Sequence, residues 1–158
     1  MLSDRRHPPH HPLVDQDNRS NILLLTVCTK DREPILTNRL VVELLLKAWF
    51  PSQHWTAGKY VVLPDHLHLF CTPTLGGRFG LARWVTSWKS FVTRNWCPAL
   101  QKPIWQRSFW DRQMRSGEDY NSKWTYVRQN PERHGLVENA DSWPFQGEVH
   151  KLVWHDRC

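Results

Sequence analysis

The sequence predicts an α+β fold in which helices cover a mostly antiparallel sheet. Two observations predict it: apolar runs of strand length alternate with two stretches of helical periodicity, and the connections are too short for long parallel crossovers. The chain of 158 residues, 40% hydrophobic and 23% charged, is long enough for one domain with a substantial core. This composition excludes wholesale disorder, and no apolar run reaches the length of about 20 residues that a membrane helix needs.

The first elements are a strand and a helix. Residues 21–28 form an apolar, β-branched run that predicts a buried strand, and a polar, turn-like stretch follows over residues 29–34. Residues 40–50 then show the pattern of a helix, which we expect Pro51 to end because a proline cannot continue the hydrogen-bond ladder.

The middle of the chain predicts a hairpin followed by the clearest helix. Two strand-like runs over residues 58–63 and 66–72 are separated by Pro64-Asp65, and this pair indicates a turn. Residues 81–96 place their apolar side chains on a single stripe at helical spacing, and basic side chains lie on the other face. We therefore expect two paired strands and then an amphipathic helix.

The last elements are a strand and a second amphipathic helix. Residues 105–114 alternate loosely and predict a strand and turn, and residues 116–119 resemble a capping box that opens a helix. We expect Pro131 to end this helix after Asn130. The order β-α-β-β-α-β-α favours a ferredoxin-like, RRM-like arrangement, a mostly antiparallel sheet with flanking helices. The polar residues 1–20, rich in His and Pro, predict a flexible arm.

The basic residues of the chain are concentrated in one segment. The net charge is +6, and residues 76–115 hold eight basic residues against a single acidic residue, Asp111. Trp and Phe residues are interleaved with these charges, a pattern that suits a nucleic-acid partner, although most of the aromatics are expected to be core. The four cysteines are far apart without a C-x-x-C pair, which argues against a zinc ribbon and a redox motif.

Two histidines are candidates for metal binding. His66 and His68 are two residues apart in a predicted strand, so both imidazoles point to the same face and could bind a divalent metal together. Such a pair also arises by chance on a solvated strand face, so the metal site needs a third ligand and a nucleophile. Asp65 precedes His66 directly and is expected to face away from it, which makes Asp65 an unsuitable further ligand.

The helix over residues 118–130 supplies both missing groups. Tyr120, Trp124 and Val127 form its buried stripe, whereas Tyr126 points away from that stripe. Asn130 is four residues after Tyr126 and is expected to share its face. A phenol beside a metal site predicts attack on a phosphodiester, with a covalent phosphotyrosine as the product.

Five blocks of sequence carry a resemblance to a known family. They are LPDHLHL from Leu63, WQRSFWD from Trp105, EDY from Glu118, YVRQNPERHGLV from Tyr126, and WPF from Trp143. In this order and spacing the chain resembles the single-tyrosine HUH transposases, and among them the REP-associated tyrosine transposases. The resemblance covers residues 22–145, so we expect a transposase domain over residues 21–145 and a C-terminal tail over residues 146–158.

The resemblance implies a role for each candidate residue. It implies that Tyr126 is the nucleophile and that His66, His68 and Asn130 bind Mg²⁺ or Mn²⁺, although relatives may have Gln or Glu in place of Asn130. It further implies a single-strand DNA endonuclease and strand transferase that recognises hairpins of repetitive extragenic palindromes and holds a 5′ phosphate on its tyrosine. The basic segment is expected to contact the hairpin backbone through five residues: Arg83, Lys89, Arg107, Arg112 and Arg115.

Three further expectations and three alternatives complete the sequence-based interpretation. We expect a cytoplasmic, nucleoid-associated protein with no membrane partner, acting as a monomer rather than a homodimer. The main alternative is a protein of the same fold that binds hairpins or single strands without cleaving them, and an RRM-type binding module is related to it. A two-histidine phosphoesterase is the third; it would need His54-Trp55-Thr56 to face His66-Leu67-His68.

Overall fold

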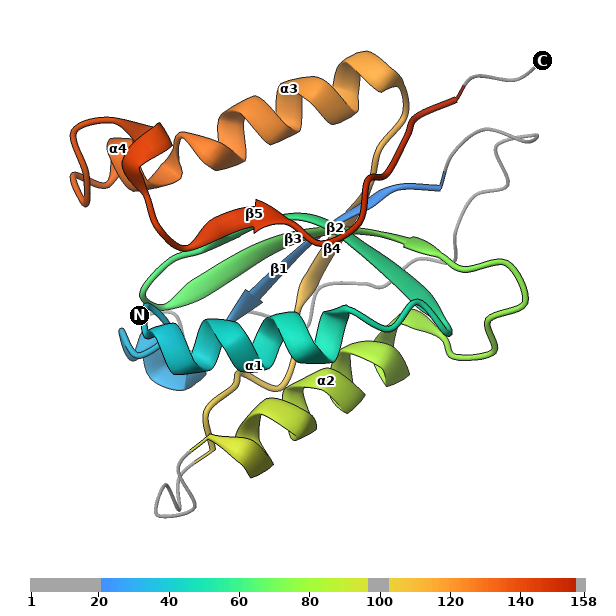
Figure 1. Ribbon diagram of the computed structural model, residues 1–158, viewed down its shortest axis with the longest axis horizontal. Coiled ribbons are helices and arrows are strands. Elements are labelled where there is room, and N and C mark those ends of the chain that lie inside the picture. The colour runs from blue at the N-terminus through green and yellow to red at the C-terminus, as the bar shows by residue number, and fades with distance from the viewer. Residues whose placement is uncertain (1–20, 97–102, 156–158) are drawn as a thin grey trace.

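The computed structural model describes residues 21–96 and 103–155, and its architecture confirms the predicted α+β fold. Figure 1 shows one sheet with helices α1 and α2 on one side and helix α3 on the other. None of the helices within these ranges is long and apolar enough to cross a membrane. The four α-helices of these ranges are α1 (Arg39–Trp49), α2 (Leu81–Asn95), α3 (Gly117–Arg128) and α4 (Asn130–Arg133).

The sheet has five strands in the order β4-β1-β3-β2-β5, and every neighbouring pair is antiparallel. The mostly antiparallel sheet predicted from the sequence is therefore confirmed. The strands are β1 (Leu23–Cys28), β2 (Trp55–Val62), β3 (His66–Pro73), β4 (Trp110–Gln113) and β5 (Gln146–Glu148). Two short 3₁₀ helices, η1 (Lys30–Arg32) and η2 (Ala140–Ser142), connect other elements.

The alternation of side chains along the central strands separates two hydrophobic layers. Leu67, Leu69 and Cys71 of β3 pack into the larger core beneath α1 and α2. The residues between them point to the opposite face, where Phe70 packs against Tyr120 of α3. The two histidines of β3 share this second face, because side chains two residues apart lie on the same side of a strand.

Both helices of the larger core begin and end close to their predicted positions. The side chain of Asn38 accepts a hydrogen bond from the backbone N–H of Leu40 and caps α1, which ends at Trp49 shortly before Pro51. In α2 the predicted apolar stripe is buried, and Trp88 packs edge-on against Trp49 of α1. Packing of these two aromatic side chains joins the helices into one layer.

Two predictions for the second half of the chain are wrong in detail. The strand predicted over residues 105–114 is confined to Trp110–Gln113, because Trp105 makes only an isolated bridge with Thr29. The helix predicted to run to Asn130 ends at Arg128, and Pro131 lies in the first turn of α4. A proline fits there because the first N–H groups of a helix have no intrahelical acceptor.

The final described residues belong to the sheet and its second core. Residues 146–148 of the expected C-terminal tail form β5 and pair with β2, and Leu152 is buried beside Phe70. A Cβ atom on Gly58 of β2 would lie 2.6 Å from the side chain of Leu152. The tail therefore packs where only a glycine leaves room. The arm predicted over residues 1–20 lies outside the described residues.

This close approach predicts the effect of a larger residue in β2. Gly58→Ala should lower the free energy of unfolding by about 1–3 kcal/mol, because the added methyl group overlaps Leu152. The double variant Gly58→Ala, Leu152→Ala should lose clearly less than the sum of the two single variants, as measured by urea unfolding followed by tryptophan fluorescence. Additive losses would show that the two residues are not in contact.

Candidate active site

The site is built around the two histidines at the start of β3. The centroids of the His66 and His68 rings are 5.0 Å apart and their planes are nearly perpendicular. The prediction that both side chains lie on one face of a strand is therefore confirmed. The ring of His134, which follows α4, is 6.5 Å from that of His66, so the end of α4 lies next to the pair.

Each imidazole has its Nδ1 atom bonded to another part of the protein. Nδ1 of His66 is 2.7 Å from Oδ1 of Asp65, and Nδ1 of His68 is 2.9 Å from the hydroxyl of Thr26 on β1. A ring that donates its Nδ1–H in this way is fixed in orientation, and its Nε2 keeps a free lone pair. In that tautomer, Nε2 is the nitrogen of each ring that could bind a metal.

The expectation that Asp65 faces away from His66 is wrong. Asp65 precedes β3, so the alternation of the strand does not determine its direction, and its second oxygen accepts a hydrogen bond of 2.9 Å from Nε of Arg32. Burial alone would raise the pKa of Asp65, but the bonds from Arg32 and His66 outweigh it and lower the pKa. Asp65 is therefore a carboxylate that orients His66 from behind.

The surroundings of the histidines keep both of them neutral. Burial, followed by electrostatic repulsion from His66, Arg133 and His134, lowers the pKa of His68 to about 3. Burial also lowers the pKa of His66, although the bond to Asp65 opposes this shift. A neutral imidazole is the form that binds a metal, so the site needs no deprotonation at neutral pH.

The helix α3 presents Tyr126 to solvent, as predicted. Tyr126 is 61% exposed, whereas Tyr120 and Val127 on the same helix are buried. The guanidinium of Arg133 lies over the Tyr126 ring at 3.8 Å, and its Nη2 donates a hydrogen bond of 2.7 Å to the backbone oxygen of Tyr126. An exposed phenol held beside a cation is a suitable nucleophile for an anionic substrate.

Asn130 is buried and is tied to the same arginine. Nη2 of Arg133 donates a hydrogen bond to Oδ1 of Asn130, so one side chain joins Asn130 to Tyr126. Asn130 begins α4 rather than continuing α3, so the two residues do not lie on one continuous helix as predicted. They are connected instead through the side chain of Arg133. Sequence reasoning did not single out Arg133, although its spacing of three residues from Asn130 is that of neighbours on a helix.

The donor set fits a divalent metal. In the part of the chain that the structure describes, no group of three His, Cys, Asp or Glu residues is arranged to hold a metal. A third ligand from these residues would therefore be of another type. The buried amide oxygen of Asn130 is such a donor, and its present partner is a cation. Two neutral imidazoles and an amide oxygen suit Mg²⁺ or Mn²⁺ with modest affinity.

The phosphoesterase alternative does not fit the fold. His54 stacks on Phe79 at a centroid distance of 3.8 Å and precedes Trp55, which pairs with Pro73 at the far end of β3. At a rise of about 3.3 Å per residue, His54 lies roughly 20 Å along the sheet from the histidine pair. The two motifs therefore do not face each other.

Comparison with known proteins decides the family. No model of a protein family matches the chain. Over 132 residues the chain is 31% identical to the REP-associated tyrosine transposase of Escherichia coli (strain K12), and the match covers 84% of the chain and 71% of that relative. The chain belongs to the REP-associated tyrosine transposases. This membership confirms the resemblance found in the sequence and supports a DNA-processing enzyme.

Two further similarities agree with this family. A putative REP-associated tyrosine transposase of Haemophilus influenzae (strain ATCC 51907 / DSM 11121 / KW20 / Rd) is 30% identical over 96 residues, which cover 53% of each chain. The solved structure of a REP-associated tyrosine transposase bound to a REP hairpin superposes with a TM-score of 0.67 and 24% identity. It covers 87% of this chain and 82% of that one. At this identity the superposition shows a shared fold.

The five residues predicted to contact DNA are divided between the two faces of the sheet. Arg83 on α2 stacks on Phe79 at 3.9 Å, and Arg107 lines an open hollow beside α2, so both lie on the side of the larger core. Arg112 on β4 pairs with Leu24, which packs in the cores beneath α3, so Arg112 shares the face of the histidines. Arg115 follows β4 and is exposed.

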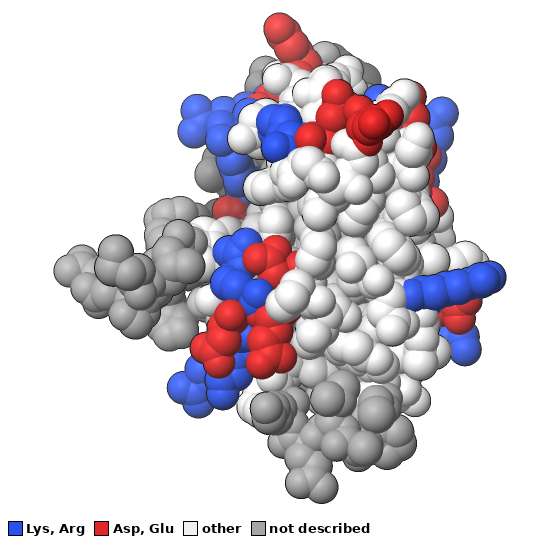
Figure 2. All heavy atoms as spheres, turned by 90° about the vertical axis from the view of Figure 1, so that its left-hand side faces the viewer, with Lys and Arg blue, Asp and Glu red and all other residues white. Residues whose placement is uncertain are grey.

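The charges at the α4 end of the molecule are mixed in sign. Figure 2 shows this end, where basic and acidic side chains lie next to each other at the top and along one flank and uncharged residues cover the middle. The described part of this face is therefore not a uniformly basic patch. Contact with a polyanion here would depend on individual arginines rather than on a general positive field.

Lys89 is placed differently from the four arginines. It is buried, its Nζ donates a hydrogen bond of 2.9 Å to the backbone oxygen of Gln106, and burial lowers its pKa to about 8. The helical pattern places residue 89 beside the apolar stripe, but the loop that covers it comes from residues 105–109, far along the chain. Its ammonium group therefore bonds within the protein instead of being exposed at the surface.

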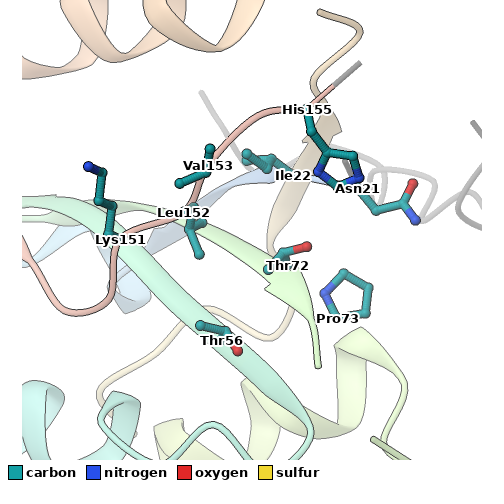
Figure 3. A pocket seen from close by; sticks show the side chains of 9 residues that line it. All are labelled: Asn21, Ile22, Thr56, Thr72, Pro73, Lys151, Leu152, Val153 and His155. Carbon is teal, nitrogen blue, oxygen red and sulfur yellow. The ribbon is translucent and has the colours of Figure 1, made fainter. Parts of the chain in front are cut away.

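A second hollow lies at the far end of the sheet. Its volume is about 370 Å³. It is lined by the two residues before β1, by Thr56 of β2, by the end of β3 and by the last described residues (Figure 3). Thr72 and Pro73 line it, and they are separated from His66 by nearly the whole length of β3. The residues that line it do not belong to the histidine site.

The buried position of Lys89 predicts an alkaline increase in stability. The folded-state pKa of about 8 lies below the usual lysine value of 10.5, so the unfolded chain binds more protons between these values and stability rises with pH there. In thermal or urea unfolding between pH 8 and 10, the wild type should gain stability relative to Lys89→Met, on the order of 1 kcal/mol per pH unit. Parallel profiles for the two proteins would show that Lys89 is solvated.

Proposed function

We propose that the chain is a single-strand DNA endonuclease and strand transferase that acts on hairpin-forming repeats through a covalent 5′-phosphotyrosine at Tyr126. The family membership supports a DNA-processing enzyme, and the solved relative of the same fold is bound to a REP hairpin. The observation that carries the proposal is the histidine pair, in which both Nδ1 atoms are bonded and both rings are neutral. We assign His66, His68 and Asn130 as the ligands of Mg²⁺ or Mn²⁺.

Cleavage at Tyr126 would exchange a phosphodiester bond in the DNA for a bond between phosphorus and the tyrosine oxygen. The phenol oxygen attacks the phosphorus of a phosphodiester, the new bond joins tyrosine to the 5′ phosphate, and the 3′ oxygen leaves and takes up a proton. The phenol proton is lost to solvent, to which the 61% exposed ring gives direct access. A divalent metal bound to the three ligands would neutralise charge on the phosphate and orient it. Joining is the reverse reaction, so the bond energy is retained and no ATP is needed.

Contacts within one chain connect several of the candidate residues. Arg133 contacts Tyr126 and Asn130, and its charge acts on His68, so nucleophile and ligands come from neighbouring elements of one chain. This arrangement supports the expectation of a monomer.

The strand β4 offers a path for single-stranded DNA toward the histidines. Trp110 is half-buried and pairs with Thr26, whose other neighbour across the sheet is His68. Trp110 and Arg112 lie two residues apart on the same face, and such a pair suits stacking of a base and contact with a phosphate. We therefore assign Arg112 as the DNA contact closest in the sheet to the site.

The nucleophile is tested by replacing a single hydroxyl group. The substrate is an end-labelled single-stranded hairpin oligonucleotide from repeats that flank the gene, mixed with the protein and Mn²⁺. Wild-type protein should give a labelled band at the mass of protein plus DNA on a denaturing gel, and Tyr126→Phe should give none while still shifting the hairpin on a native gel. EDTA should also prevent formation of the band.

Tyr120→Phe is the matched control for this experiment. Tyr120 lies on the same helix, but its hydroxyl is buried without a hydrogen-bond partner among the described residues, and burial raises its pKa to about 12. This variant should form the adduct as the wild type does. An adduct with Tyr126→Phe would contradict the nucleophile assignment. Hairpin binding by the wild type without any adduct would favour the alternative, a hairpin-binding protein of the same fold.

The DNA contact is tested by the salt dependence of binding. Arg112→Ala should weaken hairpin binding and reduce the slope of log K against log salt by about 1, because one phosphate contact is lost. Lys89→Met is the control, since its ammonium group is buried and bonded to Gln106, and its slope should equal that of the wild type. Fluorescence anisotropy at several salt concentrations measures both. A reduced slope for Lys89→Met with no change for Arg112→Ala would reverse the assignment.

A further inference from the structure

The side chain of Arg133 makes three contacts around the candidate site. Its guanidinium lies 3.8 Å from the centre of the Tyr126 ring, and Nη2 donates to the backbone oxygen of Tyr126 at 2.7 Å. The same nitrogen donates to Oδ1 of Asn130. Two of these contacts involve the nucleophile residue and one involves the candidate third ligand, so Arg133 is the side chain that connects them.

The contact with Asn130 uses the atom that a metal would need. An amide binds a hard divalent cation through its oxygen, and in this structure that oxygen accepts a charge-assisted hydrogen bond. The guanidinium and a divalent cation therefore favour the same region, and two cations at close range repel each other.

We propose that Arg133 is a positioning residue that holds Tyr126 and Asn130 together and competes with the divalent metal for Oδ1 of Asn130. This inference rests on the proposed metal site. Binding of a metal must break the bond from Arg133 to Asn130. The contacts to the ring and backbone oxygen of Tyr126 do not involve that atom, so they keep the guanidinium beside the phenol after Asn130 is released.

The competition predicts that removal of the charge strengthens metal binding. Arg133→Met keeps the length of the side chain but lacks the charge and the donors. Titration of the full chain with MnCl₂ in a calorimeter, without DNA, should give a dissociation constant about tenfold lower for Arg133→Met than for the wild type, because no charge-assisted hydrogen bond must be broken. Arg133→Lys keeps the charge and should remain close to the wild type.

Arg128→Met is the matched control. Arg128 is also an arginine near the end of α3, but its guanidinium pairs with Asp141 instead of Asn130. Its Mn²⁺ affinity should equal that of the wild type. The double variant His66→Ala, His68→Ala measures Mn²⁺ bound elsewhere, including at His7, His10 and His11 of the N-terminal residues, and this background is subtracted. Circular dichroism and the Tm of each variant establish that it is folded.

The possible outcomes separate this inference from the proposed function. Tighter binding by Arg133→Met alone supports the competition, and so does binding by this variant when the wild type shows none. Equal binding by both, abolished by the double histidine variant, overturns the role of Arg133 and leaves the metal site intact. Loss of binding in Arg133→Met also overturns it, because Arg133 would then build the site. Binding that does not exceed the background in either protein overturns both proposals.

Discussion

The antiparallel register between β1 and β3 determines where the chemistry of this protein lies. In this register Thr26 is opposite His68, and Leu25 and Val27 are opposite Leu69 and Leu67. A slip by one residue would turn the two imidazoles into the apolar core beneath α1 and α2, where their polar nitrogens would have no partners. The hydrophobic side chains that favour the observed register therefore also fix the direction of the histidines.

The residues around the candidate site disfavour protonation of its two histidines. Burial keeps the two histidines neutral, and the neighbouring Arg133 and His134 reinforce this by making a further positive charge unfavourable. The carboxylate of Asp65 lies behind His66 and is paired with Arg32. Each candidate ligand is thus held by a second protein group, which reduces the freedom that would be lost if a metal or a phosphate binds.

Local pattern was sufficient to predict much of this arrangement. The shared face of His66 and His68 follows from the period of a strand, and the exposure of Tyr126 follows from the period of a helix; the structure confirms both. What local pattern missed depends on contacts between distant segments. Lys89 is buried by a loop that follows α2, and Thr26 reaches His68 only through the pairing of β1 with β3. Arg133 owes its position to the break between α3 and α4, at which Pro131 starts a new helix instead of ending the old one.

The strand β5 also affects how the molecule behaves toward other copies of itself. Without residues 146–148, the eight-residue strand β2 would present a row of unpaired backbone groups to solvent. Exposed strands of this length readily pair with a neighbouring chain and begin aggregation. In the structure the two outer strands are β4 with four residues and β5 with three, and strands this short are poor templates for growth of the sheet. The short segment after the last helix therefore covers an edge at which β2 could otherwise pair with another copy of the chain.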